Sequence, residues 1–355
     1  MRTFSRKTII FAHENIISTI ITSYKDMKRV FTTIMTACLA ACTVMMASCG
    51  GSGNNNGTQN NSNESEIEYS GTGEPKQVDL AAYGLDADFL DHYRNQDIAD
   101  FGDLIQSFPS PVEVSAIIQD MKVPYNESLL LDAGKASDFE TSFKKSLGLG
   151  LFCADLGYLN VYDKTTDVLS YLVSIRTLTD ALKLAQFFDF QSLKRIATNN
   201  NNLDSLLILS TMSYYNMDNY LRENNRADVS AMMVTGVWTE SLYLASQVYK
   251  KKENKRMRDH IASQKLILDK LMAVLVHYMG DKIDYVKLVS AFKELSKAYE
   301  PVVIENMDGE DKVEVVNGQT VTTQGSYTVI TVSDEQMTQM CKAVETLRKK
   351  ITEAL

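Results

Sequence analysis

Long segments with an apolar residue at every third or fourth position fill most of the chain beyond residue 137. This spacing places the apolar side chains on one face of an α-helix. Polar or helix-breaking stretches such as Asn199–Asn202 and Gly280 separate these segments. The pattern predicts helices over the ranges 138–161, 165–189, 203–223, 227–250, 255–279 and 281–299, and a short one earlier, at 86–93.

A further helix is predicted to begin at Pro111. Ser110 suits the capping position before a helix, Pro111 suits its first turn, and Glu113 completes a capping box. This helix should end near Met121, because Pro124 favours an extended conformation in the residue before it.

After Pro301 the apolar and polar residues alternate with a period of two, which is typical of β-strands. Lys312–Val316 and Gln319–Thr323 flank Asn317-Gly318, a preferred sequence for a two-residue hairpin turn. Tyr327–Thr331 is a further predicted strand. The sequence therefore predicts a small β-hairpin after the helices.

A last amphipathic helix should follow, because Ser333 and Gln336 form a second capping box ahead of an apolar stripe. The predicted fold class is mainly α: a multi-helix bundle with a small β-hairpin and a C-terminal helix. Its parts are short N-terminal helices at 77–136, a six-helix core at 137–300, the hairpin at 301–332 and the last helix at 333–355.

Two stretches of the six-helix core, 85 residues apart, read alike. Phe152–Leu159 and Val237–Leu244 share an apolar residue, Cys or Trp, a small residue, an acid, and then Tyr-Leu. The alignment pairs Asp155 with Glu240 and suggests two pseudo-repeated three-helix units packed face to face. Chance similarity between amphipathic helices is the alternative.

The segment 27–48 has a basic start and an apolar stretch too short for a comfortable membrane span, as in a signal peptide. Its end resembles the lipobox of bacterial lipoproteins, in which the Cys after small residues is acylated. We therefore expect lipidation at Cys49. Cys42 also fits that pattern, and cleavage without lipidation is a third possibility. Residues 1–26 are expected to reflect a wrongly chosen upstream start codon, since the signal is complete without them.

Residues 49–76 are rich in Gly, Ser and Asn and show no apolar periodicity. Such a composition predicts a flexible tether, which would span roughly 25–30 Å as a random coil. A lipid at Cys49 would then hold the helical body close to a membrane without embedding it.

The charge of the chain disfavours nucleic-acid binding. Of 36 Lys/Arg and 45 Asp/Glu, residues 1–49 hold six and two, which leaves a net charge of −13 for residues 50–355. A body this acidic repels phosphate backbones. Cys153 and Cys341 are the only cysteines beyond the leader, and we expect two buried thiols, with a bridge between them as the alternative.

Asp155 and Glu240 interrupt apolar helix faces, so each needs a partner. Two acids facing each other in a bundle core can share a proton or bind a metal. Metal-binding bundles of that kind use Glu-x-x-His pairs, which the chain lacks, so no metal and no cofactor is expected. We expect instead that a helix N-terminus or a Tyr hydroxyl binds each acid separately.

Three aromatic residues lie beside these acids. Tyr158 and Tyr243 would line any pocket that the two acids share, and Trp238 would either stack on a ligand or fill the core. A stripe of small residues, Gly150, Ala154 and Gly157, predicts the close approach of another helix. The basic run at 250–258 predicts a solvated loop, or contact with anionic lipid.

The segments Phe108–Glu113, Ala154–Tyr158 and Leu203–Leu207 together resemble uncharacterised helical exported proteins and lipoproteins of Bacteroidota. The resemblance covers about residues 105–300. It implies an exported helical protein and transfers no activity. Surface-displayed lipoproteins of such bacteria often carry an acidic run after the lipidated Cys. Gly50–Asn63 has none, so we expect the periplasmic face of a membrane, with the outer membrane favoured.

The sequence lacks the Gly-x-Ser-x-Gly, Walker, His-Glu-x-x-His, Cys-x-x-Cys and dinucleotide motifs of large enzyme classes. We therefore expect a lipid-anchored helical module that binds or scaffolds another protein of the cell envelope. The alternative is a small-ligand binder or atypical hydrolase that uses a core pocket near Asp155 and Glu240. A cavity shared by the two acids would favour this alternative.

Overall fold

The computed structural model describes residues 78–96, 111–198, 203–309, 312–316, 319–323, 325 and 327–353. Its helices are η1 (Leu80–Tyr83), α2 (Ala87–Arg94), α4 (Pro111–Met121), η2 (Glu127–Leu129), η3 (Ala133–Asp138), α5 (Ser142–Val161), α6 (Thr165–Ala181), η4 (Ala185–Phe187), α7 (Phe190–Thr198), α8 (Leu203–Glu223), α9 (Ala227–Lys251), α10 (Lys255–Met279), α11 (Ile283–Tyr299) and α12 (Asp334–Glu353). Its strands are β1 (Val303–Met307), β2 (Lys312–Val316), β3 (Gln319–Thr323) and β4 (Tyr327–Thr331).

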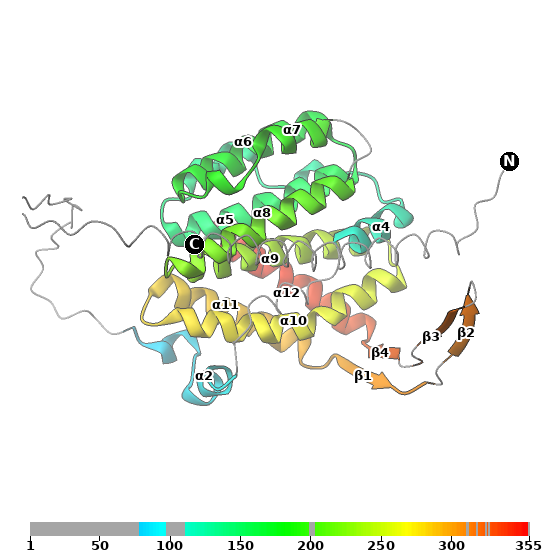
Figure 1. Ribbon diagram of the computed structural model, residues 1–355. Helices are drawn as coiled ribbons and strands as arrows, with labels where there is room; N and C mark the ends of the chain where they lie inside the picture. Colours follow the sequence, from blue (N-terminus) through cyan, green and yellow to red (C-terminus); the bar gives the residue numbers. More distant parts are fainter. Residues whose placement is uncertain are drawn as a thin grey trace, which may run out of the picture. The chain divides into compact units, whose positions relative to one another are not determined.

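The described residues form a mainly α bundle with a small β-ribbon and a C-terminal helix, as predicted (Figure 1). The signal peptide, Cys49, the tether and the cap at Ser110 lie outside the described residues, so those predictions stay untested by the structure. Helix α4 nevertheless begins at Pro111 and ends at Met121, as its sequence signals indicate.

Helices α5 and α9 pack backbone to backbone inside the bundle. A Cβ atom added to Gly150 would lie 2.1 Å from the carbonyl oxygen of Met233, and one added to Gly236 would lie 2.2 Å from that of Leu147. Residues on α5 thus meet residues about 86 positions later on α9, and the two helices run in the same direction. The close approach predicted at Gly150 is confirmed.

The small-residue stripe does not extend as far as predicted. Gly157 is exposed, and a Cβ atom there would meet nothing within 4 Å. Only the part of the stripe around Gly150 serves helix packing.

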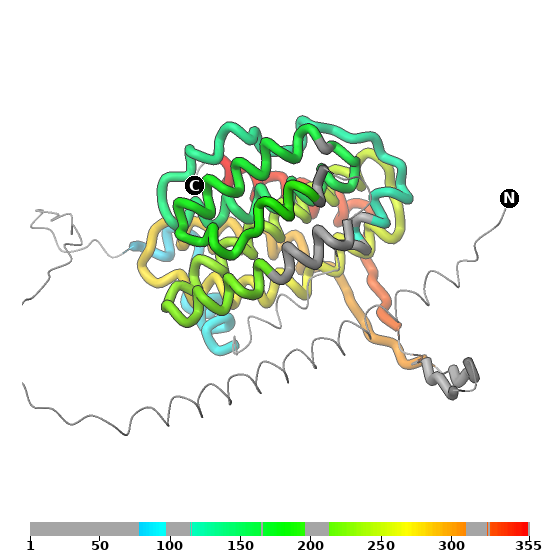
Figure 2. The backbone as a smooth tube through the Cα atoms, turned by 45° about the horizontal axis from the view of Figure 1, so that its top comes forward, coloured from blue at the N-terminus to red at the C-terminus, as the bar shows by residue number. Residues whose placement is uncertain are grey.

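Two apolar clusters lie on either side of the α5–α9 pair. One joins α5 to α6, α7 and α8 and contains Leu149, Phe152 and Leu159, whereas the larger one joins α9 to α10, α11 and α12. Figure 2 follows the same division, with the green α6–α8 and the yellow α10 and α11 in separate regions. This arrangement agrees with two helical units, while an internal duplication stays a prediction.

The predicted helix 165–189 is wrong in extent, since α6 ends at Ala181. Lys183 adopts a left-handed conformation with φ of 59°. The N–H of Lys183 donates to the carbonyl oxygen of Asp180 at 3.1 Å, and the N–H of Leu184 donates to the carbonyl oxygen of Thr179 at 2.7 Å. This is a Schellman end, which usually carries Gly, so a lysine there gives no stop signal in the sequence.

The β-ribbon contains a strand that the sequence pattern misses. β1 pairs with β4 in antiparallel register, from Val303 opposite Thr331 to Met307 opposite Tyr327. The predicted pairing of β2 with β3 is confirmed, with Lys312 opposite Thr323. The expected turn at Asn317-Gly318 lies outside the described residues.

The capping box before α12 is confirmed. The N–H of Ser333 donates to Gln336 Oε1 at 2.7 Å, and the N–H of Gln336 donates to Ser333 Oγ at 3.1 Å. These two bonds satisfy N–H groups that a helix start leaves free, which explains where the ribbon ends and α12 begins.

Candidate functional site

Asp155 and Glu240 meet in the interior, which is the less expected of the two arrangements that the sequence leaves open. Both residues have 0% exposed surface, and their carboxyl groups lie close enough for the charge of Glu240 to act on Asp155. The glycine contact between α5 and α9 lies about one helical turn away and brings the two helix backbones close enough for this meeting. Asp155 Oδ2 also accepts a hydrogen bond from the N–H of Leu131 at 3.0 Å.

Arg348 of α12 forms an ion pair with Glu240. Its Nε donates to Glu240 Oε2 and its Nη2 to Glu240 Oε1, both at 3.1 Å, which is a bidentate ion pair. Nη2 also donates to the carbonyl of Leu129 at 3.3 Å, and the guanidinium lies 4.7 Å from the centre of the Tyr243 ring. The side chain of Arg348 is 18% exposed, so this ion pair is mostly shielded from water.

Sequence reasoning missed Arg348, although a signal exists. The residue lies in the apolar stripe of the last helix, four residues after Val344 and three before Ile351, both of which are buried. A charged residue in such a stripe needs a buried partner of opposite charge. The pattern therefore suggests that a buried acid lies elsewhere, but it does not say which one.

The two acids differ in protonation. Burial and the adjacent charge of Glu240 raise the pKa of Asp155 well above its usual range. Burial also raises the pKa of Glu240, but the Arg348 guanidinium opposes that rise. Of the two acids, Asp155 therefore favours the neutral form more strongly, while the Arg348 guanidinium favours the anionic form of Glu240. A neutral Asp155 beside the Glu240–Arg348 ion pair leaves no net charge, which lowers the cost of burying the three side chains.

Three tyrosines, Tyr125, Tyr158 and Tyr162, continue this polar cluster beyond Asp155. Their ring centres are 4.8 to 5.9 Å apart. Burial raises the pKa of Tyr125 to about 12, so its hydroxyl stays neutral. Among the described residues, the buried side-chain polar atoms without a hydrogen-bond partner are the hydroxyls of Tyr125, Tyr158 and Tyr162 and Oδ1 of Asp155.

The cluster, together with two side chains of α6, binds the backbone of segment 129–133, which connects the short 3-10 helices η2 and η3. Leu129 accepts from Arg348, the N–H of Leu131 donates to Asp155, and the carbonyl of Leu131 accepts from the Tyr171 hydroxyl at 2.5 Å. Ser174 Oγ donates to the carbonyl of Ala133 at 2.7 Å. A connecting segment packed on a bundle must satisfy its own backbone groups. These side chains do so from α5, α6 and α12.

Trp238 fills the core. Its Nε1 donates to the buried Gln264 Oε1 at 2.9 Å, and its ring centre lies 5.9 Å from that of Phe292. Tyr243 supports Arg348, and Tyr158 belongs to the tyrosine cluster. The candidate residues of α5 and α9 thus lie in one region, but Trp238 is held in the core by partners other than the acids.

The described residues offer no metal site, since no three His, Cys, Asp or Glu side chains converge on one point. Cys153 and Cys341 are free thiols. Burial raises the pKa of Cys153 to about 12 and that of Cys341 to about 11, so neither is a ready nucleophile.

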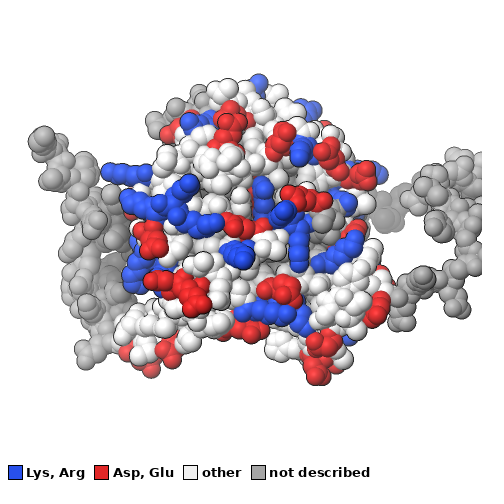
Figure 3. All heavy atoms as spheres, turned by 180° about the vertical axis from the view of Figure 1, so that it is seen from behind, with Lys and Arg blue, Asp and Glu red and all other residues white. Residues whose placement is uncertain are grey.

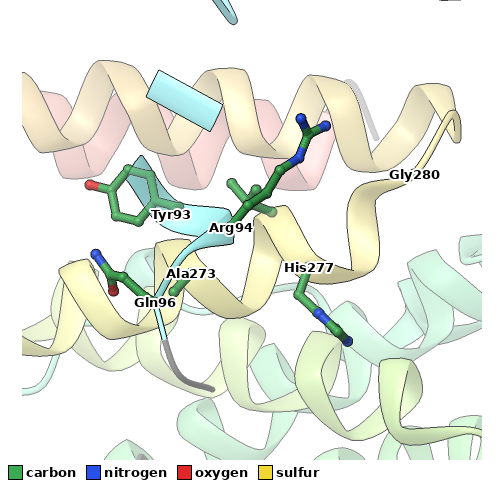
Figure 4. Close-up of a pocket in the computed structure, with 7 residues that line it drawn as sticks. Tyr93, Arg94, Gln96, Ala273, His277 and Gly280 are labelled. Atoms are coloured by element: carbon green, nitrogen blue, oxygen red, sulfur yellow. The ribbon is translucent and has the colours of Figure 1, made fainter. Parts of the chain in front are cut away.

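A hollow of about 210 Å³ lies beside α2 and the end of α10, away from the acid pair (Figure 4). Its polar side chains do not converge, because Arg94 and His277 point in opposite directions. The Tyr93 hydroxyl donates to Asp269 at 3.2 Å. A second hollow, of about 280 Å³, lies between α11 and α12 and is lined by Leu295 and Leu347 with Lys342 and Lys350.

The basic run between α9 and α10 is largely bound to the rest of the chain. Lys250 pairs with Glu345 at 2.5 Å, Arg256 with Asp120 at 3.0 Å, and Arg258 with Asp334 at 2.5 Å. Lys252 donates to the carbonyl of Met121 at 2.9 Å. On the face seen in Figure 3, basic and acidic side chains are interspersed. The basic side chains of this run therefore make mainly intramolecular contacts.

No described helix is both long enough and apolar enough to cross a membrane. No protein-family model, curated protein or solved structure matches the chain, and the resemblance to exported proteins of Bacteroidota stays a prediction.

Proposed function

We propose that the protein is a lipid-anchored module that binds or scaffolds another component of the bacterial envelope, at the periplasmic face of a membrane. The leader, Cys49 and the Gly/Ser/Asn-rich tether support the anchor and the compartment. The helical body would stand off the membrane at the end of the tether.

One observation carries this proposal: other residues of the same chain bind both buried acids. Glu240 is bound by Arg348, and Asp155 by the N–H of Leu131. Groups held in this way stabilise the bundle, and this favours a function exerted by the outer surface. An acidic body with mixed surface charge suits protein partners better than phosphate-bearing ones.

Metabolic labelling with a fatty-acid analogue tests the anchor in the full chain. The label should incorporate into the wild type, persist in Cys42→Ala and disappear in Cys49→Ala. If the label is lost in Cys42→Ala but kept in Cys49→Ala, Cys42 is the lipidated residue. An unlabelled wild type would refute a lipid anchor.

Mild crosslinking on isolated membranes tests the binding role. The same envelope protein should be recovered with the wild type in independent preparations. It should be depleted with Cys49→Ala, which leaves the body intact and removes the anchor. Repeated recovery of no specific partner would contradict the proposal.

A small-ligand site is the second candidate, favoured by the buried hydroxyls of Tyr125, Tyr158 and Tyr162 beside Asp155. Two observations count against it: both acids are already bound, and the two hollows described above lie elsewhere. A ligand held by these hydroxyls should be lost from Tyr162→Phe, which keeps the ring. Native mass spectrometry of both proteins would show it, and identical masses apart from the substitution would exclude it.

A further inference from the structure

The β-ribbon, which consists of β1, β2, β3 and β4, extends away from the helices (Figure 1). Its base is fixed to the bundle. Ile304 and Ile330 pack partly buried against the apolar core, and Lys265 Nζ donates to the carbonyl of Val302 at 2.6 Å. Beyond this base, the described strands form only two-stranded sheets, β1 with β4 and β2 with β3.

A two-stranded ribbon has two outer edges with backbone groups that no neighbouring strand binds. Within the described residues, no additional strand pairs with any of the four. Isolated two-stranded ribbons are marginally stable in water, and a third or fourth strand makes a sheet stable. The ribbon therefore has the geometry of a surface that gains stability when another strand is added.

The two edges of the ribbon differ in charge. The outgoing half of the ribbon consists of β1 and β2, and residues 303–316 of the sequence include five acids and one lysine. The returning half consists of β3 and β4, and residues 319–331 of the sequence include no charged residue and five threonines. Exposed edges are normally protected from pairing by charged side chains or proline. The outgoing edge has this protection, and the returning edge does not.

One face of the ribbon base also presents apolar side chains to water. Met307 and Tyr327 are cross-strand neighbours, with 43% and 57% of their surface exposed, and Val303 on the same face is 46% exposed. Strand addition at the returning edge would extend this face with further side chains and cover part of Tyr327.

We infer that the returning half of the ribbon of one molecule pairs in antiparallel fashion with the returning half of a second copy. Two-fold symmetry then joins identical edges and makes a four-stranded sheet. The acids of both outgoing halves lie at its outer edges, where they repel further chains. A self-partner fits because two uncharged edges meet without repulsion, whereas a basic peptide would be drawn to the outgoing half.

This inference goes beyond the proposed function, because it adds contact with a second copy of the chain to the contact with another envelope component. A tether to one membrane would favour the contact, because it confines the copies to a common plane at a high effective concentration. Membrane attachment is not required for the pairing itself, so the two proposals can fail separately.

The chain offers a matched pair of substitutions. Thr328 on β4 and Asn306 on β1 are directly opposite and both exposed, and Thr328 Oγ1 donates to Asn306 Oδ1 at 3.0 Å. Thr328→Lys and Asn306→Lys therefore each remove the same hydrogen bond and add the same charge. Only Thr328→Lys places that charge on the unprotected edge.

Sedimentation of the full chain in mild detergent measures the pairing. The wild type should show a monomer–dimer equilibrium. Thr328→Lys should weaken the dimer by roughly tenfold or more, and Asn306→Lys by less than about twofold. A wild type that is monomeric at every concentration would overturn the inference. Equal effects of the two lysines, or no effect of either, would also overturn it, because the interface would then lie elsewhere.

Disulfide crosslinking on intact membranes provides a second measurement of the pairing, with one cysteine introduced into the ribbon at a time. Oxidation should yield disulfide-linked homodimers from one or more of Thr320→Cys, Thr322→Cys and Thr328→Cys, and none from Glu305→Cys. Homodimers from Glu305→Cys alone would refute the edge assignment. Dimers formed without recovery of any envelope partner would leave self-pairing intact and refute only the hetero-partner part of the proposed function.

Discussion

At the scale of single residues, Asp155 and Glu240 have different tasks although both are buried acids. Glu240 must be charged, because a neutral residue there leaves the Arg348 guanidinium without its bidentate partner. The raised pKa of Asp155 favours its neutral form, and its Oδ2 accepts a hydrogen bond from the N–H of Leu131. The two positions should therefore respond differently to substitution by the corresponding amides.

Glu240→Gln should lower the free energy of unfolding by about 3 kcal/mol, since it leaves a mostly buried cation unpaired. Asp155→Asn keeps a neutral side chain of the same shape and should cost less than about 1 kcal/mol. Urea unfolding measures both values. Equal losses in the two variants would contradict the assigned protonation. Combining Glu240→Gln with Arg348→Met should recover part of the loss.

The raised pKa of Asp155 also predicts a pH dependence. The folded state holds the proton of Asp155 more tightly than the unfolded chain does, in which the pKa of an Asp is about 3.9. As the pH rises above that value, the unfolded chain loses the proton first, so the favourable contribution of Asp155 falls. The stability of Asp155→Asn relative to wild type should therefore increase from pH 4 toward neutrality, by up to about 1.4 kcal/mol per pH unit. A difference that does not change with pH would contradict this assignment.

At the scale of elements, the α5–α9 contact depends on two glycines that only a tertiary structure can interpret. The sequence pattern predicts α2, α4, α8, α9, α10 and α12 closely, because caps and apolar periodicity are local signals. It fails at Lys183, where a left-handed residue other than Gly ends α6, and at β1, whose partner β4 lies 20 or more residues away. It also fails to separate Gly150 from Gly157, since spacing alone does not show which one meets another helix.

Gly150→Ala and Gly157→Ala test that contact as a matched pair on one helix. The first places a methyl group 2.1 Å from a backbone oxygen of α9, so α5 and α9 must separate, and we expect a loss of at least about 2 kcal/mol. The second adds a methyl group in open space and should stabilise α5 by about 0.5–1 kcal/mol. Thermal and urea unfolding measure both. A neutral Gly150→Ala would mean that the helices are not in backbone contact.

At the scale of the whole described region, the site joins parts of the chain that local patterns treat separately. The paired stretches single out Asp155 and Glu240 but leave open whether the two acids meet or are bound separately. They do not predict Arg348, which follows Glu240 by 108 residues, or the binding of segment 129–133. Neither Arg348 nor segment 129–133 shares a local sequence pattern with the two acids. The sequence therefore does not show that they lie close to the acids. The sequence thus identifies the helix pair, while tertiary packing supplies the group that neutralises it.

These cross-connections predict that the two apolar clusters unfold together. The α5–α9 contact and the Arg348 ion pair link the cluster of α6–α8 to that of α10–α12, so losing one side exposes the buried charges of the other. Trp238, in the larger cluster, and Cys153, packed against the smaller one, are natural probes of each side. Trp238 fluorescence and Cys153 labelling, resolved by mass spectrometry, should have the same urea midpoint. Glu240→Gln should shift both midpoints equally. Labelling of Cys153 well before the fluorescence change would show that the α6–α8 side opens by itself, and that the polar cluster does not couple the two halves.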